Sequence, residues 1–564
     1  MYGHINIALF LKLLCMSSFD IKELDYEPDL CTLNGTGSMI SQRRDFYVSE
    51  LCLENGCLTK DSETFTNRLV NVDDLVSNIR SYSHCDACYN SQCRKDAFEI
   101  KDNLDEAVNP CDDFYQFACG GWLKRNTIPE NESYVSVYSK LEDRISHQLK
   151  TLLEMATGID PPYIRMAKEM YKSCMDEESL KKAGSEPLKK ILKDLGGWPV
   201  TEGDSWDPES YDWIDHLIKL REKGLNHNIL IGLSVVEDLQ SVTGYLIKLD
   251  QPSLELGRER LFPSNTEGKF GYFDLMLKVA RLLSANDDSS LEPSSIFNPA
   301  YLDIALKVEA FENSLKIMSS NSDHRIRHKI KVQRLMDEAK DVDWLKYLNG
   351  LVDARISKDD NLFIDDYFYL RYFSSYIRNA DKRVVANYIN WRVVHETLPL
   401  LSKEWRTLGQ RPLDKPDVPE KQPRWKQCVS SLMDNLAVAI NTYYVEYHLD
   451  RETYYKVDHM FLTLKNVMAN VVLESEWMDV ETSMTARNKV LNMDIHISYP
   501  TRLLNSRIAE RYENLTLSNE SYFDKEMKVR KWSTDYSFSH LKTHPHSNTA
   551  LGFKRRPTDT YVVF

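Results

Sequence analysis

Residues 393–400 read VVHETLPL and come within one position of a zinc-peptidase signature. In H-E-x-x-H, histidines at i and i+4 lie on one helical face and bind zinc, while the glutamate activates water. Here His395 and Glu396 supply the first half, but the fifth position is Pro399. Proline removes the second ligand, and its ring clashes with the carbonyl four residues back, that of His395. The pattern therefore predicts a structural or surface role for His395.

A second histidine cluster comprises His540, His544 and His546. The first two have i, i+4 spacing, but no glutamate lies between them and Pro545 indicates a helix end. A polar loop is therefore favoured over a metal site. The sequence also contains no G-x-S-x-G nucleophile elbow and no glycine loop for phosphate. These patterns assign no catalytic, metal-binding or cofactor-binding residue to the chain.

Cysteine usage indicates an oxidising environment. The chain has 11 cysteines, most of them between Cys31 and Cys119, and four Asn-x-Ser/Thr sequons, at Asn34, Asn131, Asn514 and Asn519. Together they predict an extracellular, glycosylated protein, either secreted or the ectodomain of a membrane protein. The C-x2-C of Cys85 and Cys88 has no second ligand pair at suitable spacing, which favours a disulfide over zinc. The pairing of Cys31, Cys52, Cys57 and Cys85 stays open.

Charge and hydropathy exclude some classes of function. The net charge is -14, and the 71 Lys and Arg residues are scattered, so nucleic acid is not an expected partner. No apolar run is long enough for a transmembrane helix, and residues 1–18 are a possible signal segment. The oligomeric state is left open by these patterns.

The elements that would position any site are mainly helical. Residues 19–95 form a cysteine-rich extension with little periodicity, whereas 96–495 show apolar residues at helical spacing, as in Tyr272, Met276, Val279 and Leu283. Residues 228–236 and 243–249 predict a β-hairpin. The run 560–564 predicts a strand, whose edge would be unpaired unless further chain continued the sheet.

The most structured motif is Asn109–Trp122, which reads NPCDDFYQFACGGW. Proline and two aspartates favour a helix start, and the paired glycines favour its end. Within one helix Cys111 and Cys119 would lie about 12 Å apart along the axis, too far for a mutual disulfide. Each cysteine is therefore expected to need a partner elsewhere.

That motif resembles the opening of the neprilysin and endothelin-converting-enzyme family of zinc metallopeptidases. Further matches follow in family order: Met170–Cys174, Glu186–Leu188, Gly197–Pro199, Asp250–Pro252, Trp425–Cys428, Tyr444–Glu446, Trp477–Thr482 and Tyr499–Pro500. The resemblance implies a mainly α fold, in which a multi-helix N-terminal domain caps a thermolysin-like catalytic domain and restricts access to short peptides. It places the helical domain at 96–495, with a few short strands, and the start of a truncated catalytic domain, with its first strand, at 496–564.

The resemblance also implies what this sequence lacks. Family members carry H-E-x-x-H and a glutamate ligand in the C-terminal part, so zinc is expected only in a full-length form, and this chain is expected to be inactive. Where the family has arginines for the substrate carboxylate, this chain has Tyr134 and Glu142. The alternative is a secreted, non-catalytic member that binds peptides or a protein partner.

Several disulfides follow from the resemblance alone. Cys174 and Cys428 match a bridge inside the helical domain, and Cys88 and Cys93 match a short N-terminal bridge. Cys111 and Cys119 match cysteines whose partners lie in the catalytic part, so those partners are expected to be missing here.

Overall fold

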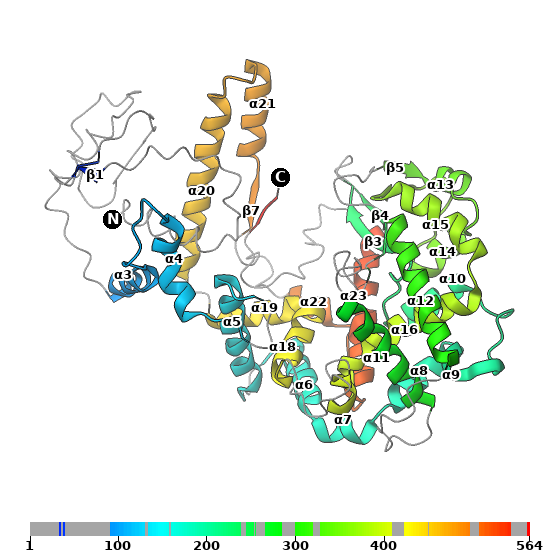
Figure 1. The fold of residues 1–564 in the computed structure, drawn as a ribbon. Coiled ribbons are helices and arrows are strands. Elements are labelled where there is room, and N and C mark those ends of the chain that lie inside the picture. The colour runs from blue at the N-terminus through cyan, green and yellow to red at the C-terminus, as the bar shows by residue number, and fades with distance from the viewer. Residues whose placement is uncertain are drawn as a thin grey trace. The chain divides into compact units, whose positions relative to one another are not determined.

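A computed structural model describes residues 33–34, 38–39, 91–129, 134–156, 160–238, 244–252, 254, 266–284, 299–319, 328–408, 422–448, 451–496, 507–542 and 561–563. The fold is mainly α-helical, as predicted (Figure 1). The chain divides into two compact units, residues 1–145 and 146–564, and the division falls inside helix α5 (Val137–Glu154). That point lies within the span 96–495, which the sequence suggests as one domain.

In the first unit, helices α3 (Ser91–Asn103) and α4 (Phe114–Arg125) pack closely together. Asp113 caps α4, since its carboxylate accepts a hydrogen bond from the Gln116 amide over 2.8 Å. The prediction that the paired glycines end this helix is wrong, because α4 continues through them to Arg125. A Cβ on Gly121 would lie 2.5 Å from the Leu104 carbonyl oxygen, so glycine permits the close approach of the backbone that follows α3. The short strands β1 (Leu33–Asn34) and β2 (Ser38–Met39) pair antiparallel.

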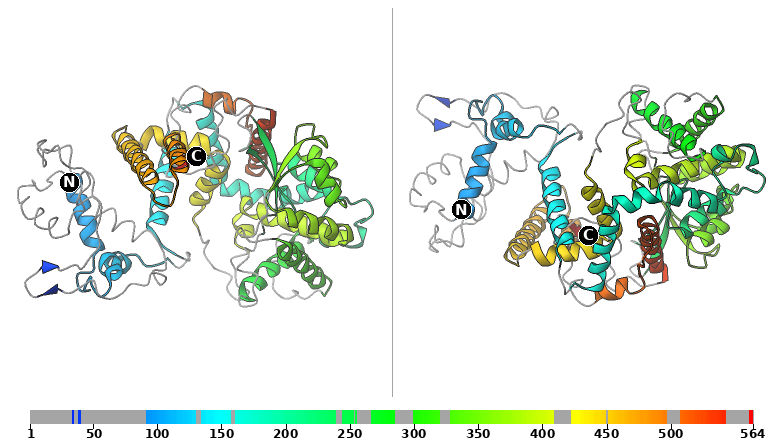
Figure 2. Two further views of the ribbon diagram at one scale, coloured as in Figure 1. Left: turned by 90° about the horizontal axis from the view of Figure 1, so that it is seen from above. Right: turned by 90° about the horizontal axis from the view of Figure 1, so that it is seen from below.

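The second unit is built from helices around a small sheet (Figure 2). Its helices up to the middle of the chain are α6 (Pro162–Met175), α7 (Glu177–Ala183), α8 (Glu186–Asp194), α9 (Pro199–Glu202), α10 (Trp213–Glu222), α11 (Thr266–Ser284), α12 (Pro299–Met318), α13 (Val332–Glu338) and α14 (Trp344–Leu351). Those that follow are α15 (Tyr367–Asn379), α16 (Lys382–Thr397), α17 (Lys403–Arg406), α18 (Arg424–Asn435), α19 (Ala437–His448), α20 (Arg451–Leu473), α21 (Val480–Leu491), α22 (Arg507–Tyr512) and α23 (Tyr522–Ser539). Short 3-10 turns are η2 (Gly203–Ser205), η6 (Leu398–Leu400) and η9 (His540–Lys542).

Many of these helices begin at an aspartate. Its side chain accepts a hydrogen bond from a backbone N–H in the first turn, and its charge complements the helix dipole. Such N-caps open α7, α10, α14, α15, α16 and α21, at Asp176, Asp212, Asp343, Asp366, Asp381 and Asp479.

The larger sheet of the second unit has four strands in the order β3-β4-β6-β5. Strands β3 (Gly232–Glu237) and β4 (Tyr245–Asp250) form the predicted antiparallel hairpin. Strand β6 (Asn361–Ile364) pairs parallel to β4 and antiparallel to β5 (His328–Lys331). Side chains alternate along β4, with Tyr245, Ile247 and Leu249 buried, so one face of the sheet packs on the core.

Helix α16 runs through the core of this unit, and its residues 385–394 are all buried. A helix that is buried on every side must satisfy its polar groups internally. Asn387 Oδ1 accepts from the Val200 amide over 2.9 Å, and Asn390 Nδ2 donates to the Ala386 carbonyl over 3.0 Å. The VVHETLPL segment is therefore the last turn of a core helix and the turn that follows it.

Two features near the C-terminal end differ from expectation. The strand β8 (Tyr561–Val563) pairs antiparallel with β7 (Asp494–His496), so one of its edges is occupied. Helix α23 packs against α6 and α18, and Lys525 Nζ lies 2.7 Å from Glu169 Oε1. The compact unit that begins at residue 146 thus continues past the boundary expected at 495/496.

Candidate functional site

The last turn of α16 places Glu396 in an ion pair. Glu396 Oε1 accepts a hydrogen bond from Arg530 Nη1 of α23 over 2.5 Å. The neighbouring His395 ring lies 5.5 Å from the Trp391 ring, centroid to centroid. The acid that would activate water in a zinc peptidase is here bound to a guanidinium.

Pro399 marks the end of α16. The helix stops at Thr397, and Pro399 lies in the 3-10 turn η6. Thr397 Oγ1 donates back to the Val393 carbonyl over 2.9 Å. The carbonyl of Pro399 accepts from Arg424 Nη1 over 3.0 Å. The predicted distortion at this proline is therefore a helix end, which Arg424 ties to α18.

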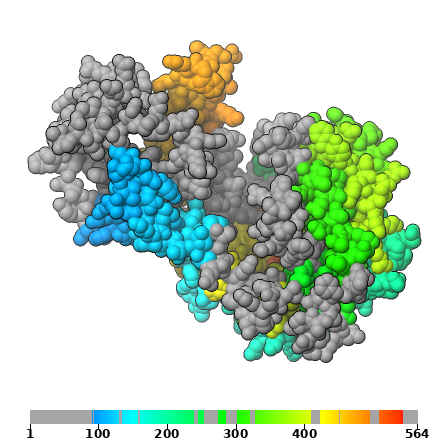
Figure 3. Space-filling model, viewed as in Figure 1, coloured from blue at the N-terminus to red at the C-terminus, as the bar shows by residue number. Residues whose placement is uncertain are grey.

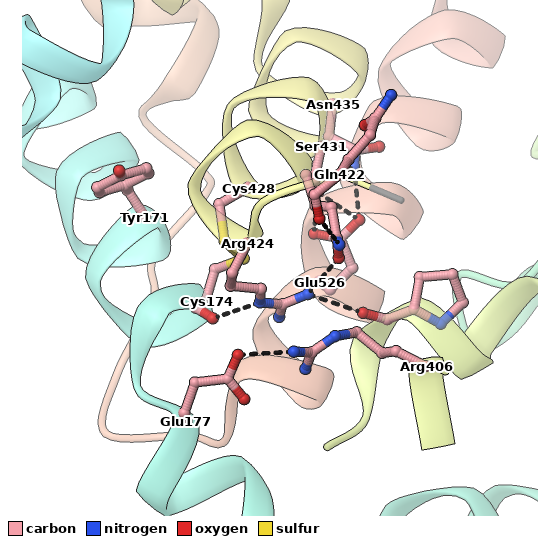
Figure 4. The surroundings of a disulfide bond; sticks show 12 residues. Tyr171, Cys174, Glu177, Arg406, Gln422, Arg424, Cys428, Ser431, Asn435 and Glu526 are labelled. Atoms are coloured by element: carbon pink, nitrogen blue, oxygen red, sulfur yellow. Dashed lines mark hydrogen bonds and ion pairs between the residues drawn. A yellow bond between two sulfur atoms is a disulfide. The ribbon is translucent and has the colours of Figure 1, made fainter. Parts of the chain in front are cut away.

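The same arginine lies beside the Cys174–Cys428 disulfide (Figure 4). That bond joins α6 to α18 with a Cα–Cα distance of 5.9 Å, which confirms the pairing implied by the family resemblance. Arg424 Nε donates to the Cys174 carbonyl over 2.9 Å, so one buried guanidinium links the end of α6 to the turn after α16. The sequence analysis did not predict this role of Arg424. The one signal for it in the sequence is its position directly before the Trp425–Cys428 motif.

We call the meeting point of the end of α6, the turn after α16 and the start of α18 the Arg424 junction. A second buried arginine, Arg406, adds further hydrogen bonds there. Arg406 Nη1 donates to the Leu401 carbonyl over 2.8 Å. Arg406 Nη2 donates to Glu177 Oε1 over 2.6 Å (Figure 4). Cations near the carbonyl ends of helices interact favourably with the helix dipole. Arg406 and Arg424 therefore cross-link the ends of three segments that are distant in the sequence.

The surroundings of the disulfide (Figure 4) also contain a buried carboxylate, that of Glu526 on α23, which is 0% exposed. It accepts hydrogen bonds from Ser431 Oγ over 3.0 Å and from Asn435 Nδ2 over 2.6 Å (Figure 4). It accepts a third from Arg530 Nε over 2.9 Å. A buried charge is tolerated when it is paired and hydrogen-bonded in this way. Arg530 thus connects Glu526 to Glu396 in one cluster of charges.

A pocket of about 260 Å³ opens next to this junction, between α6, α7, the turn after α16 and the start of α23. Its wall combines polar and apolar side chains, among them Ser173, Asp176, Ser179, Leu180, Asn519, Glu520, Ser521 and Tyr522. The pocket is smaller than the roughly 300–1,000 Å³ typical of sites for drug-sized ligands. It could hold a single small polar ring.

The second histidine cluster is only partly described. His540 is buried in η9, where its Nδ1 lies 2.8 Å from the Tyr536 carbonyl oxygen. Burial lowers the pKa of His540. His544 and His546 lie outside the described residues. The described member of the cluster is thus a core histidine next to Tyr245 and Tyr536.

Burial also depresses the pKa of two further histidines. The pKa of His216 falls to about 4 by desolvation, with Lys219 acting in the same direction. The pKa of His227 falls to about 4 by desolvation, with Arg221 acting in the same direction. Both rings are therefore neutral at pH 7, and each places an Nε2 in the interior that no described residue hydrogen-bonds.

The remaining cysteines lie in the first unit. Cys93 and Cys119 are both disulfide-bonded, which differs from the expectation that the partner of Cys119 lies beyond this chain. Cys88 lies outside the described residues, so its pairing with Cys93 stays a prediction. Cys111 lies before α4 rather than within it, so the expected single helix containing both Cys111 and Cys119 does not form.

The sequon asparagines and the two residues at the family's arginine positions are either exposed or outside the residues that the structure describes. Asn514 and Asn519 are both exposed. Asn131 lies outside the described residues, and the side chain of Asn34 in β1 does too. Tyr134 is exposed, and Glu142 lies on α5.

The residues described in the structure do not fit a zinc ion. Among them no group of three or more His, Cys, Asp or Glu side chains is placed to bind a metal. H-E-x-x-H occurs nowhere in the 564 residues. Within the same described ranges, no helix has the length and hydropathy to cross a membrane.

Comparison with known proteins identifies the family. The model of peptidase family M13 matches residues 110–500. Neprilysin-2 of Drosophila melanogaster is 30% identical over 480 residues, which are 81% of this chain and 61% of the relative. Human membrane metallo-endopeptidase-like 1 is 29% identical over 527 residues, 90% of this chain and 66% of the relative. This chain thus spans less than two thirds of the length of either relative.

A solved structure shares the fold. The crystal structure of the zinc metalloprotease Zmp1 of Mycobacterium tuberculosis aligns with a TM-score of 0.63 at 18% identity, covering 78% of this chain and 64% of that one. The motifs from Pro110 to Pro500 fall in the segment that the family model matches. The chain therefore belongs to peptidase family M13, the family of its relatives neprilysin and endothelin-converting enzyme.

Proposed function

We propose that this chain supplies the helical part of a neprilysin-like zinc metalloendopeptidase that acts on short peptides, and that these 564 residues alone hydrolyse no peptide. One observation carries the proposal: the only His-Glu pair in the sequence ends a core helix, and its glutamate is paired with Arg530. The chemistry of peptide hydrolysis then depends on residues that this sequence does not contain. The helical part would restrict which peptides reach them.

An apolar surface on α20 and α21 supports this role. The two helices pack together through Ala469, Val472 and Val490. On α20, however, Met460, Leu464, Val467, Met468 and Val471 are all exposed, and their spacing of i, i+4, i+7, i+8 and i+11 places them on one face. Part of this helix pair is visible in orange in Figure 3. A contiguous exposed apolar face marks an interaction site, and we assign it to a catalytic part of the peptidase.

The relatives support the substrate class and the location. The name of human membrane metallo-endopeptidase-like 1 describes an endopeptidase at a membrane, and the aligned solved structure is that of a zinc metalloprotease. The Cys174–Cys428 disulfide and the exposed sequons at Asn514 and Asn519 fit an oxidising, glycosylating compartment. We therefore place the protein outside the cell, as a secreted chain or an ectodomain.

The test is an assay of the purified 564-residue chain with added zinc. A quenched fluorescent peptide should not be cleaved, and elemental analysis after dialysis should find only substoichiometric zinc. Zinc-dependent cleavage that persists in His395→Ala would contradict the proposal, because it would require a site that the sequence does not contain. Cleavage abolished by that substitution would show instead that His395 is a ligand. Peptide binding without cleavage would favour the non-catalytic binding role.

A further inference from the structure

Two sequons lie close together in the segment between α22 and α23, and the structure distinguishes them. Asn514 begins Asn-Leu-Thr and Asn519 begins Asn-Glu-Ser, and both asparagines are exposed. Of the two, Asn519 lines the 260 Å³ pocket beside α6 and α7, whereas Asn514 is not among its lining residues. A group attached to Asn519 would therefore begin at the rim of a preformed hollow.

The walls of this pocket suit a single sugar ring. Ser173, Asp176 and Ser179 supply hydroxyl and carboxylate groups, while Leu180 and Tyr522 supply apolar surface. Small concave sites with a few placed polar groups and an apolar wall bind compact polar ligands. An N-acetylglucosamine ring offers hydroxyl and amide donors on its edge and C–H groups on its faces.

Glu520, the middle residue of the sequon, supplies an acceptor in the same pocket. Its Oε1 accepts from Lys528 Nζ over 3.1 Å. The Lys528 ammonium holds the pKa of the Glu520 carboxyl below its usual range, so the group is a carboxylate at neutral pH. Its Oε2 is shielded from solvent, and the side chain of Ser518 also lowers the pKa of this carboxyl. A donor placed in the pocket would give this carboxylate a further hydrogen bond.

The third residue of the sequon has a separate structural role. Ser521 is the N-cap of α23: its Oγ accepts from the Asp524 amide over 3.1 Å and lies 2.7 Å from Asp524 Oδ2. Ser521→Ala would therefore remove the sequon and the helix cap together. Asn519→Gln removes only the sequon, which makes it the informative variant.

We propose that Asn519 carries an N-linked glycan and that its first N-acetylglucosamine occupies this pocket. The proposal rests on the extracellular location given above. In the transfer, a bond forms between Asn519 Nδ2 and C1 of the sugar, and the bond from C1 to the diphosphate of a lipid-linked oligosaccharide breaks. The proton lost from Nδ2 leaves with the lipid diphosphate, and no group is oxidised or reduced.

The experiment uses the full chain, secreted from glycosylating cells behind a cleavable leader, so that secretion itself is not in question. Glycopeptide mass spectrometry measures occupancy at Asn514 and Asn519. Native protein is then treated with peptide N-glycosidase F, which must reach the bond between asparagine and the first sugar. The expected result is that the Asn519 glycan is released at least about tenfold more slowly than the Asn514 glycan, since a contact worth 1.4 kcal/mol gives that factor.

Matched variants identify the contact. Glu520→Gln retains a sequon, so Asn519 should remain occupied while its slow release is lost. Lys528→Gln removes the ion pair but keeps the carboxylate, so slow release should persist. Trimming the glycan to one sugar with endoglycosidase H should leave Tm unchanged, whereas Asn519→Gln should lower it by about 1–2 °C. Asn514→Gln should not change it.

Two results would overturn the proposal. The first is an unoccupied Asn519 in a chain whose Asn514 is occupied. The second is release of the Asn519 glycan as fast as that of Asn514. Neither result bears on peptide cleavage or zinc content, so failure here is distinguishable from failure of the proposed function.

Discussion

Arg530 Nη1 lies 2.5 Å from Glu396 Oε1, and Arg530 Nε lies 2.9 Å from Glu526 Oε1. One guanidinium on α23 thus holds the glutamate that ends α16 and a fully buried carboxylate on its own helix. The half-motif that resembles a zinc site is part of the packing between α16 and α23. Its glutamate forms an ion pair that joins α16 to α23.

Replacement of Arg530 should be much more costly than replacement of Glu396. Arg530→Ala leaves the buried Glu526 without its cation, which should lower the free energy of unfolding by about 3 kcal/mol. Glu396→Gln breaks a partly exposed pair and should cost under about 1 kcal/mol. Urea unfolding measures both values. Equal costs would show that Glu526 does not depend on Arg530.

Loss of the Cys174–Cys428 disulfide should destabilise the second unit by about 3–5 kcal/mol. The bond closes a loop with a sequence separation of 254 residues, and long loops lose most entropy when they are cross-linked. Unfolding of the Cys174→Ala/Cys428→Ala variant measures the effect. Cys93 and Cys119 are also disulfide-bonded, so reductant breaks more than one bond. The control is therefore the double variant treated with reductant, which reports on the other bonds alone. If reductant destabilises that variant as much as the native chain, the effect belongs to the other bonds.

Stability should fall as the pH drops from about 6.5 to about 4. The folded pKa values of His216 and His227 are about 4, below the usual 6.5, so in this window the unfolded chain binds protons that the folded chain does not. Their contribution is complete above pH 6.5 and is lost toward pH 4, by up to about 3 kcal/mol for each ring. Unfolding at a series of pH values checks this.

Substitution can separate the contribution of the two histidines to the pH dependence of stability from that of the acidic groups. His216→Gln and His227→Gln should each flatten the slope of stability against pH between 4 and 6.5. His459→Gln changes an exposed histidine on α20 and should leave the slope as it is. An unchanged slope in both buried variants would assign the acid sensitivity to carboxylates instead.

Charged substitutions on the exposed face of α20 should leave the stability of the fold nearly unchanged. Met468 and Val471 are 50% and 57% exposed, so Met468→Asp and Val471→Asp should change the free energy of unfolding by under about 0.5 kcal/mol. They should also reduce binding of an apolar fluorescent dye. Val472→Asp is the contrast, because Val472 is 7% exposed and packs against α21. Charge there should unfold the helix pair, with loss of helical circular dichroism.

Gly121→Ala should loosen α3 from α4. The added methyl group would meet the carbonyl oxygens of Asp102 and Leu104, and forced overpacking costs about 1–3 kcal/mol. Hydrogen exchange in α3 and α4 should become faster. Gly244→Ala is the control, since a Cβ there meets nothing within 4 Å. Unchanged protection in Gly121→Ala would mean that the backbone yields at little cost.

Local signals in the sequence predicted a mainly helical chain and the start of one helix. The helical spacing of apolar residues predicted α11, and Asp113, one of the two aspartates expected to open a helix, caps α4. The clash predicted at Pro399 corresponds to the end of α16. These features depend on backbone geometry within a few residues, so a single sequence is enough to predict them. The pairing of Cys174 with Cys428 came from family resemblance, because composition and spacing do not determine disulfide partners.

The sequence by itself determined that the chain is mainly helical, that Pro399 stands where H-E-x-x-H would have its second histidine, and that its motifs resemble those of the neprilysin family. Tertiary structure alone decided that Gly120 and Gly121 lie inside α4, where another backbone segment approaches, instead of ending it. It also decided that Arg530 reaches Glu396, 134 positions away. The physical reason is the same in both cases: these contacts depend on which distant segments pack together, and no local periodicity encodes that.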